Sequence, residues 1–317
     1  MRAGVAAGAG HPTARSLVDA TMSAALHGPP ALGFPHFLDY LNSFLEGRIN
    51  PDPSPYVDRP YPAFLASDAD GGIAQLGFDL AFHDLVDTVR KLGVAVFAQS
   101  NSYSTGELGY YVRRLAVEGI VGFAATNANA FMVANSGGSA VYSTNPMAFA
   151  FPLGEESPPL LIDQSASETA YVNIVAAAGE KRPIPEGWAV DETGMSTTDS
   201  TKALKGSLLP FGGRKGANVA LMVEMLSAGL SGGNWSLDAP SFNSGGACPA
   251  VGLTVVAMMP GDPGHRRMER ARKQVARLRG RGVYVPGVSG VEDRPSTSSG
   301  LSVPRAVLEA VRKIADG

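Results

Sequence analysis

The feature that most constrains the fold is the alternation of helix-length amphipathic segments with short apolar runs of strand length. Helical spacing of apolar residues covers residues 13–26, 35–45, 78–91, 109–118, 265–281 and 303–314. Apolar runs of strand length occupy residues 94–97, 120–125, 147–151, 160–162 and 251–259. This alternation predicts an α/β or mixed α+β fold, with a small helical part at the N-terminus.

The same pattern predicts three parts. Residues 1–62 form the helical N-terminal part and end in a connector with five prolines, PDPSPYVDRPYP, which continues neither a helix nor a central strand. Residues 63–260 form a mixed-sheet core. Residues 261–317 form a C-terminal helical segment, which we expect to pack back on the N-terminal part. Within the core, residues 219–230 are apolar on all sides, so we expect a buried core helix there.

Composition excludes several classes of protein. The net charge of −3 removes the electrostatic case for nucleic-acid binding, and the basic helix at 265–281 is expected to be a solvated face. The lone Cys248 forms no internal disulfide, and no Cys/His spacing indicates a metal site. No signal-peptide pattern and no run of 18 apolar residues occurs. We therefore expect a soluble cytoplasmic protein that neither enters a membrane nor binds a metal.

Two local patterns carry possible chemistry. His27 precedes Gly-Pro-Pro at the end of a predicted helix, where an imidazole either projects into a cleft as a proton donor or simply complements the helix dipole. The GGRKG segment at 212–216 precedes a helix N-terminus. It either binds an anion such as a nucleotide phosphate or is a glycine turn with two solvated cations. No GxGxxG motif follows a strand, so the usual dinucleotide fingerprint is absent.

Five longer motifs occur in a familiar order: NSYSTGELGYYVRRLAVEGIVGFAATNA, STNPMAFAFP, LLIDQSASE, IPEGWAVDETGMSTTD and LKGSLLPFGGRKGANVALMVEMLSAGLSGG. Together they resemble the malate/L-lactate dehydrogenase family of the second type. That family includes ureidoglycolate and sulfolactate dehydrogenases and the piperideine- and pyrroline-2-carboxylate reductases. The resemblance implies a non-Rossmann mixed-sheet NAD(P)-binding fold, NADPH or NADH as cofactor, a small-molecule substrate, and a homodimer with the active site between subunits.

The resemblance also implies a set of site residues. It places the cofactor against three segments: Ser104, Thr105 and Gly106; Asp163, Gln164 and Ser165; and Arg214 with Lys215. It places the catalytic residues at His27, Asn173 and Tyr171, and the substrate-binding positions at Ala31, Thr144 and Val172.

Four of these positions depart from the family pattern. Leu26 replaces a serine before the histidine, and Ala31 replaces an arginine that grips the substrate carboxylate. Ser104 replaces a second histidine, and Asn173 replaces the carboxylate that supports the imidazole. Losing the arginine removes a bidentate carboxylate clamp, and losing the acid weakens support for a protonated imidazole. The sequence therefore predicts that a small 2-oxo acid is not the substrate.

Two functional hypotheses follow. The first is an NAD(P)H-dependent reductase of a cyclic imine or ketone in specialised metabolism, with His27 as proton donor. The alternative is a repurposed member that catalyses a non-redox acid/base step, such as cyclisation, dehydration or isomerisation, in natural-product biosynthesis. A third and weaker hypothesis is a catalytically inactive partner subunit.

Overall fold

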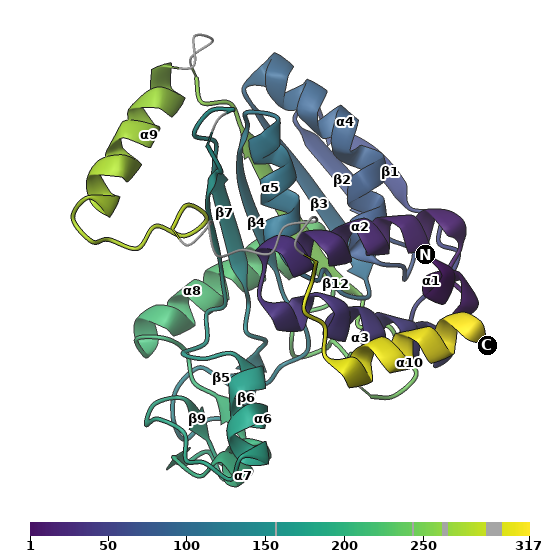
Figure 1. The fold of residues 1–317 in the computed structure, drawn as a ribbon, viewed down its shortest axis with the longest axis vertical. Coiled ribbons are helices and arrows are strands. Elements are labelled where there is room, and N and C mark those ends of the chain that lie inside the picture. The colour runs from purple at the N-terminus through teal and green to yellow at the C-terminus, as the bar shows by residue number, and fades with distance from the viewer. Residues whose placement is uncertain (156, 243, 262–265, 290–299) are drawn as a thin grey trace.

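The computed structural model describes residues 1–155, 157–242, 244–261, 266–289 and 300–317, and shows a mixed α/β fold built on two mixed sheets (Figure 1). The predicted fold class is confirmed. The larger sheet has the strand order β1-β2-β3-β12-β4-β7-β8. Its strands are β1 (Tyr56–Tyr61), β2 (Phe64–Asp68), β3 (Val94–Ser102), β12 (Val251–Met258), β4 (Val121–Thr126), β7 (Met147–Phe151) and β8 (Leu160–Gln164).

Strand β12 lies at the centre of the larger sheet, between β3 and β4, and runs antiparallel to both. Its side chains Leu253, Val255 and Ala257 are fully buried, as expected for the apolar run at 251–259. Only the β2–β3 pair is parallel among the strands of this sheet that the structure describes. The proline-rich connector contributes the strand β1 at the edge of the sheet. Pro60 is tolerated there because an edge strand needs hydrogen bonds on one side only.

Helices cover both faces of this sheet. Helices α4 (Ala74–Leu92) and α5 (Gly109–Val117) lie on one face, and the buried ring of Phe78 on α4 meets the rings of Phe97 and Tyr111 edge-to-face. The opposite face is covered by α8 (Arg214–Glu224) and the π-helical turn η2 (Met225–Gly229), which contact β4 and β12.

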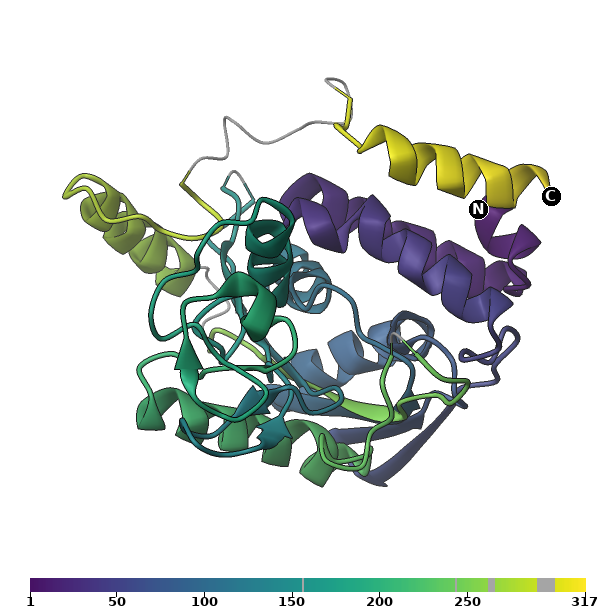
Figure 2. The same cartoon turned by 90° about the horizontal axis from the view of Figure 1, so that it is seen from below.

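The N-terminal helices form a separate layer in which both chain ends lie close together (Figure 2). This layer contains α1 (Arg2–Ala6), α2 (His11–His27), the short 3-10 turn η1 (Pro30–Leu32) and α3 (Phe34–Leu45). Helix α10 (Arg305–Asp316) contacts α1 and α3, whereas α9 (Arg266–Arg279) packs through Val275 against Leu153 and Val285. Within 261–317, therefore, α10 is the described helix that packs on the N-terminal layer. The three-part division of the chain stays a prediction.

The smaller sheet forms a lobe with the strand order β10-β9-β11-β5-β6. Its strands are β10 (Ser196–Thr197), β9 (Ala189–Val190), β11 (Ser207–Leu208), β5 (Met132–Val133) and β6 (Ala140–Tyr142). Two short helices, α6 (Tyr171–Gly179) and α7 (Ser200–Ala203), cover it. None of the helices within the described ranges has both the length and the apolar character needed to cross a membrane.

The prediction that residues 219–230 form a buried core helix is wrong for the single chain. Val223 and Ala228 are buried, but Leu221, Met222 and Met225 are between 42% and 52% exposed. The apolar residues of this segment therefore lie on two faces, an inner face that packs on the sheet and an outer face that is exposed. Composition alone does not show which apolar residues belong to which face.

Candidate active site

The backbone that follows β8 joins three of the motifs that the sequence predicts to form the site. The N–H of Ala166 donates a hydrogen bond to the carbonyl of Thr144 (2.7 Å), and the carbonyl of Ala166 accepts one from the N–H of Phe211 (3.0 Å). The N–H of Gly212 donates to the carboxylate of Glu168 (3.3 Å). The STNP, DQSAS and GGRKG segments therefore lie side by side.

The fourth motif is joined to them through Asp163. A carboxyl oxygen of Asp163 accepts a hydrogen bond from the N–H of Gly109 at the start of α5 (2.7 Å). The loop just before α5 is itself fixed, because the carbonyl of Thr105 accepts hydrogen bonds from Gln75 Nε2 (3.0 Å) and from the hydroxyl of Tyr111 (2.8 Å). The loop of Ser104, Thr105 and Gly106 is thus held by α4 and α5, and the start of α5 is joined to the strand that carries Asp163.

A cavity of about 380 Å³ lies where β8 and the start of α5 meet the end of α2. Its polar lining consists of His27, Glu107, Arg113, Asp163, Gln164 and Tyr284. His27 is the last residue of α2 and is exposed. The cavity therefore brings the predicted proton donor together with Asp163 and Gln164 from the predicted cofactor set.

A buried ion pair forms one wall of this cavity. Arg113 Nη2 donates to Glu107 Oε1 (2.6 Å) and Nη1 donates to Oε2 (3.2 Å), with side-chain exposures of only 14% and 2%. A second bond runs from Arg113 Nη1 to the hydroxyl of Ser23 on α2. A Cβ atom at Gly28 would lie 2.8 Å from Glu107 Oε1, and one at Gly109 would lie 2.5 Å from it. Two glycines therefore leave the space that this carboxylate occupies.

The Asp163 carboxyl has unusual acid–base properties. Burial raises the pKa of Asp163 to about 6, against the hydrogen bond from Gly109, which lowers it. The nearby negative charge of Glu107 raises this pKa further, and the charge of Arg113 lowers it. Asp163 is therefore a carboxyl group with a raised pKa that lines the same cavity as His27.

A second network fixes the STNP loop against α8. The buried carboxylate of Glu224 accepts hydrogen bonds from Asn145 Nδ2 (2.7 Å), from the N–H of Ser236 (2.6 Å) and from its hydroxyl (2.8 Å). Asn145 has a backbone φ of +39°, a conformation that asparagine tolerates better than most residues. This network positions Thr144 and the helix that begins at Arg214 relative to each other.

The remaining predicted residues do not line the His27 cavity. Tyr171, Val172 and Asn173 begin α6 and are exposed, and the amide of Asn173 donates to the hydroxyl of Thr169 (3.0 Å). Ala31 lies in η1 and is partly buried. The hydroxyl of Ser165 forms a hydrogen bond with the hydroxyl of Ser167 (2.9 Å). The roles predicted for these residues stay predictions.

The start of α8 suits the phosphates of a nicotinamide cofactor. Gly212 and Gly213 have φ values of +55° and +61°, and Arg214 and Lys215 are exposed in the first turn of this 11-residue helix. No acidic side chain occupies that turn. Free N–H groups, the helix dipole and two cations together favour a bound anion. Across the described ranges, no group of His, Cys, Asp or Glu could hold a metal ion.

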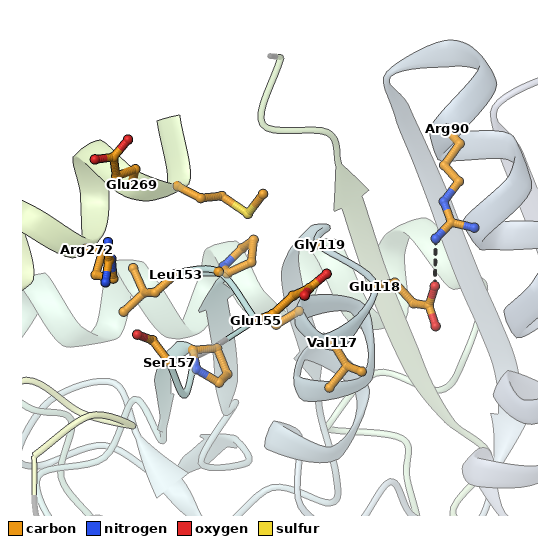
Figure 3. Close-up of a pocket in the computed structure, with 14 residues that line it drawn as sticks. Arg90, Val117, Glu118, Gly119, Leu153, Glu155, Ser157, Glu269 and Arg272 are labelled. Atoms are coloured by element: carbon orange, nitrogen blue, oxygen red, sulfur yellow. Dashed lines mark hydrogen bonds and ion pairs between the residues drawn. The ribbon is translucent and has the colours of Figure 1, made fainter. Parts of the chain in front are cut away.

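A larger cavity of about 860 Å³ lies between α9 and the end of α5 (Figure 3). Its charged lining includes Arg90, Glu118, Glu269 and Arg272, and Arg90 pairs with Glu118 at 2.7 Å. None of the site residues predicted from the sequence lines it. The smaller cavity is therefore the candidate active site.

Sequence reasoning missed Glu107, Arg113 and Tyr284 as lining residues. Glu107 directly follows the predicted Ser104–Gly106 segment, and this adjacency is the feature of the sequence that could have identified it as a site residue. Tyr284 comes from residues 280–289, far along the chain, and no local pattern connects it to His27.

The chain matches the family model described as malate/L-lactate dehydrogenase over residues 2–312. It is 35% identical to the (2R)-3-sulfolactate dehydrogenase (NADP(+)) of Chromohalobacter salexigens, over 96% of this chain and 90% of that protein. It is 31% identical to a Delta(1)-pyrroline-2-carboxylate/Delta(1)-piperideine-2-carboxylate reductase of Pseudomonas putida, over 97% of this chain and 91% of that protein.

Its fold is also similar to solved structures of such proteins. The crystal structure of delta1-piperideine-2-carboxylate reductase from Pseudomonas syringae pvar. tomato superposes with a TM-score of 0.91 at 30% identity, and covers 99% of this chain and 96% of that one. The fold and the joined motifs define a dehydrogenase or reductase of the non-Rossmann type. The chain belongs to the malate/L-lactate dehydrogenase family, and the resemblance inferred from its motifs is confirmed.

The raised pKa of Asp163 predicts a pH-dependent stability. Because the folded state favours the protonated carboxyl, stability is greatest below the unfolded pKa near 3.8 and falls as pH rises through about 6. The Asp163→Asn variant stays neutral and keeps an acceptor for Gly109. We expect the wild type to lose up to about 3 kcal/mol relative to this variant between pH 4 and pH 7, measured by urea unfolding. The exposed Glu192→Gln variant is the control, and a difference between wild type and Asp163→Asn that is constant with pH would contradict the prediction.

Proposed function

We propose that the protein is an NAD(P)H-dependent reductase of a cyclic imine, with His27 as the proton donor. The observation that carries this proposal is the cavity in which His27 meets Asp163 and Gln164, whose strand continues into the segment that hydrogen-bonds the STNP and GGRKG motifs. Relatives that act on pyrroline- and piperideine-2-carboxylate support an imine as the class of substrate. A small 2-oxo acid is not proposed, because Ala31 supplies no guanidinium for a carboxylate.

Several residues of this chain hold NADPH or NADH in the proposal. Arg214 and Lys215 bind its phosphates at the start of α8, and the Ser104–Gly106 and Gln164–Ser165 segments contact the rest of the molecule. When bound, the cofactor supplies a hydride to the carbon of the C=N bond. The buried Glu224 network keeps the STNP loop and α8 in register for this purpose.

His27 supplies the proton in the proposed reaction. The imine nitrogen gains a proton and the imine carbon gains a hydride, so that the products are a cyclic amine and the oxidised nicotinamide. Asn173 gives the imidazole no negative charge, since it is an amide hydrogen-bonded to Thr169. The carboxyl groups that line the cavity with His27 are instead Glu107 and Asp163.

Replacing His27 tests the proton-donor role. We expect His27→Ala to lower kcat for imine reduction by about 10²–10⁴-fold while leaving cofactor affinity and the unfolding midpoint nearly unchanged, because the side chain is exposed. The exposed His83→Ala variant on α4 is the matched control. Unchanged turnover in His27→Ala would assign the proton to another group, with Tyr171 and Ser104 the next candidates.

Replacing Lys215 tests the cofactor site. Lys215→Glu puts repulsion where attraction is proposed, so we expect NADPH binding to weaken by about 1–3 kcal/mol in fluorescence or calorimetric titrations. The exposed Lys91→Glu variant, at the far end of α4, carries the same charge change as a control. Equal affinities in the two variants would remove Lys215 from the site.

The non-redox alternative predicts a different result when substrate conversion and NADPH consumption are measured together. Conversion of a substrate without consumption of NADPH would favour a cyclisation, dehydration or isomerisation by His27. No described contact favours that alternative over reduction.

We also propose that the protein is a homodimer that acts in the cytoplasm in specialised metabolism. The outer face of α8 and η2 exposes Leu221, Met222, Met225 and Leu230, and the neighbouring Trp235 and Leu237 are 40% and 68% exposed. A contiguous apolar face of this kind is typical of a surface that another protein covers. The single Cys248 suits a reducing compartment, and the departures at Ala31 and Asn173 suit a specialised substrate.

Sedimentation measures the proposed dimer directly. We expect twice the chain mass of 32.8 kDa at micromolar concentration, and a shift toward the single-chain mass when Met222→Lys places a charge in the apolar face. The Val117→Lys variant, at a residue 78% exposed at the end of α5, is the control. A wild-type mass equal to one chain would contradict the proposal.

A further inference from the structure

The lining of the His27 cavity carries more negative than positive charge among the residues that the structure describes. Glu107 and Asp163 contribute carboxyl groups, and Arg113 contributes the one described guanidinium. Glu107 and Arg113 pair with each other, so their charges cancel within the wall. The charge left to a ligand is that of Asp163, which forms no ion pair with a described lysine or arginine.

Arg113 is not available to grip a substrate carboxylate. Both of its terminal nitrogens donate to Glu107, and Nη1 also donates to Ser23. The Glu107 carboxylate also sits close against the backbone of Gly28 and Gly109, so it is enclosed by these glycines as well as bonded to Arg113. An incoming carboxylate would therefore have to displace a buried bidentate partner of the same charge, which leaves that partner unpaired in a low-dielectric wall.

We infer that this cavity selects a cationic ligand, a protonated cyclic imine without a ring carboxylate, and that Asp163 is the residue that binds its charge. The inference rests on the proposed function and names its substrate class. It gives Asp163 a substrate-facing role in place of the cofactor role that the family resemblance suggests. His27 and Asp163 then act together: an imine that enters unprotonated takes its proton from His27, and Asp163 stabilises the same positively charged iminium whether it forms in the cavity or enters already protonated.

The pH dependence of Asp163 supports the inference. Its pKa of about 6 means that the carboxylate is mostly ionised at neutral pH, and a bound cation would favour ionisation further. The charged or titratable groups around it are Glu107 and Arg113 from the loop and helix α5, His27 from α2, and Tyr284 from residues 280–289.

Kinetics with two probes tests the substrate class. We compare 2-methyl-1-pyrroline, which lacks a carboxylate, with pyrroline-2-carboxylate, each with NADPH. We expect kcat/KM to be at least about tenfold higher for the carboxylate-free imine, and Asp163→Asn to lower it about tenfold or more, mainly through KM. The value for pyrroline-2-carboxylate should be unchanged or higher in that variant. Glu192→Gln, an exposed change of the same charge, should alter neither.

A binding measurement on the wild type makes the test independent of turnover and of any variant. Calorimetry with N,N-dimethylpyrrolidinium, whose charge does not change with pH, should show affinity that rises about tenfold from pH 5 to pH 7 as Asp163 ionises. Proline, which carries a carboxylate, should bind more weakly at pH 7.

The outcomes separate the inference from the proposed function. Preferred reduction of pyrroline-2-carboxylate, with Asp163→Asn indifferent, would overturn the cationic ligand and leave the reductase intact. Absence of NADPH binding and of imine reduction would overturn the reductase. If the reductase is overturned, a pyrrolidinium affinity that does not change with pH would overturn the cation site at Asp163 as well. An affinity that rises between pH 5 and pH 7 would support the cation site without any reductase activity.

Discussion

The site depends on one short stretch of backbone, residues 163–168, which begins in the last residues of β8 and joins otherwise separate parts of the chain. Ala166 is fully buried and uses both its N–H and its carbonyl to hold the STNP loop and the loop before α8. Asp163 anchors the other end of the stretch on the first N–H of α5. Because backbone groups make most of these connections, side chains along the stretch can change without separating the loops that they join. The fold is therefore able to keep its architecture while its chemistry changes.

The departures from the family pattern that the sequence predicts are compatible with this arrangement. Ala31 and Asn173 stand where the family resemblance implies charged residues, and the amide of Asn173 is hydrogen-bonded to Thr169. The charges now found beside His27 come from elsewhere, from Glu107, Arg113 and Asp163. Positions 31 and 173 themselves contribute no charged side chain. In the proposed site, the charged groups come instead from Glu107, Arg113 and Asp163.

Much of the fold could be predicted from the sequence, because strand-length apolar runs and helical periodicity are local signals. The run at 251–259 is the central strand, and the periodic segments at 13–26 and 35–45 are α2 and α3. The outer face of α8 could not be predicted, since Leu221 and Met222 have the same composition whether a core or a second molecule covers them. The pairing of Glu107 with Arg113 beside Gly28 could not be predicted from the sequence either, because it requires α2 and α5 to meet in space. His27 and the DQSAS segment could be found because family motifs marked them.

The space that Gly28 and Gly109 leave for Glu107 makes the order of sequence change important. An arginine able to bind a carboxylate already lies in the wall, neutralised by one neighbour. Exchanging Glu107 for a small neutral residue would release that guanidinium and bring the described carboxyl and guanidinium charges of the cavity from net negative to balanced in a single substitution. Replacing either glycine with a larger residue first would instead place a Cβ atom against the Glu107 carboxylate. A change in the charge of this cavity would accordingly be made more easily at position 107 than at 28 or 109.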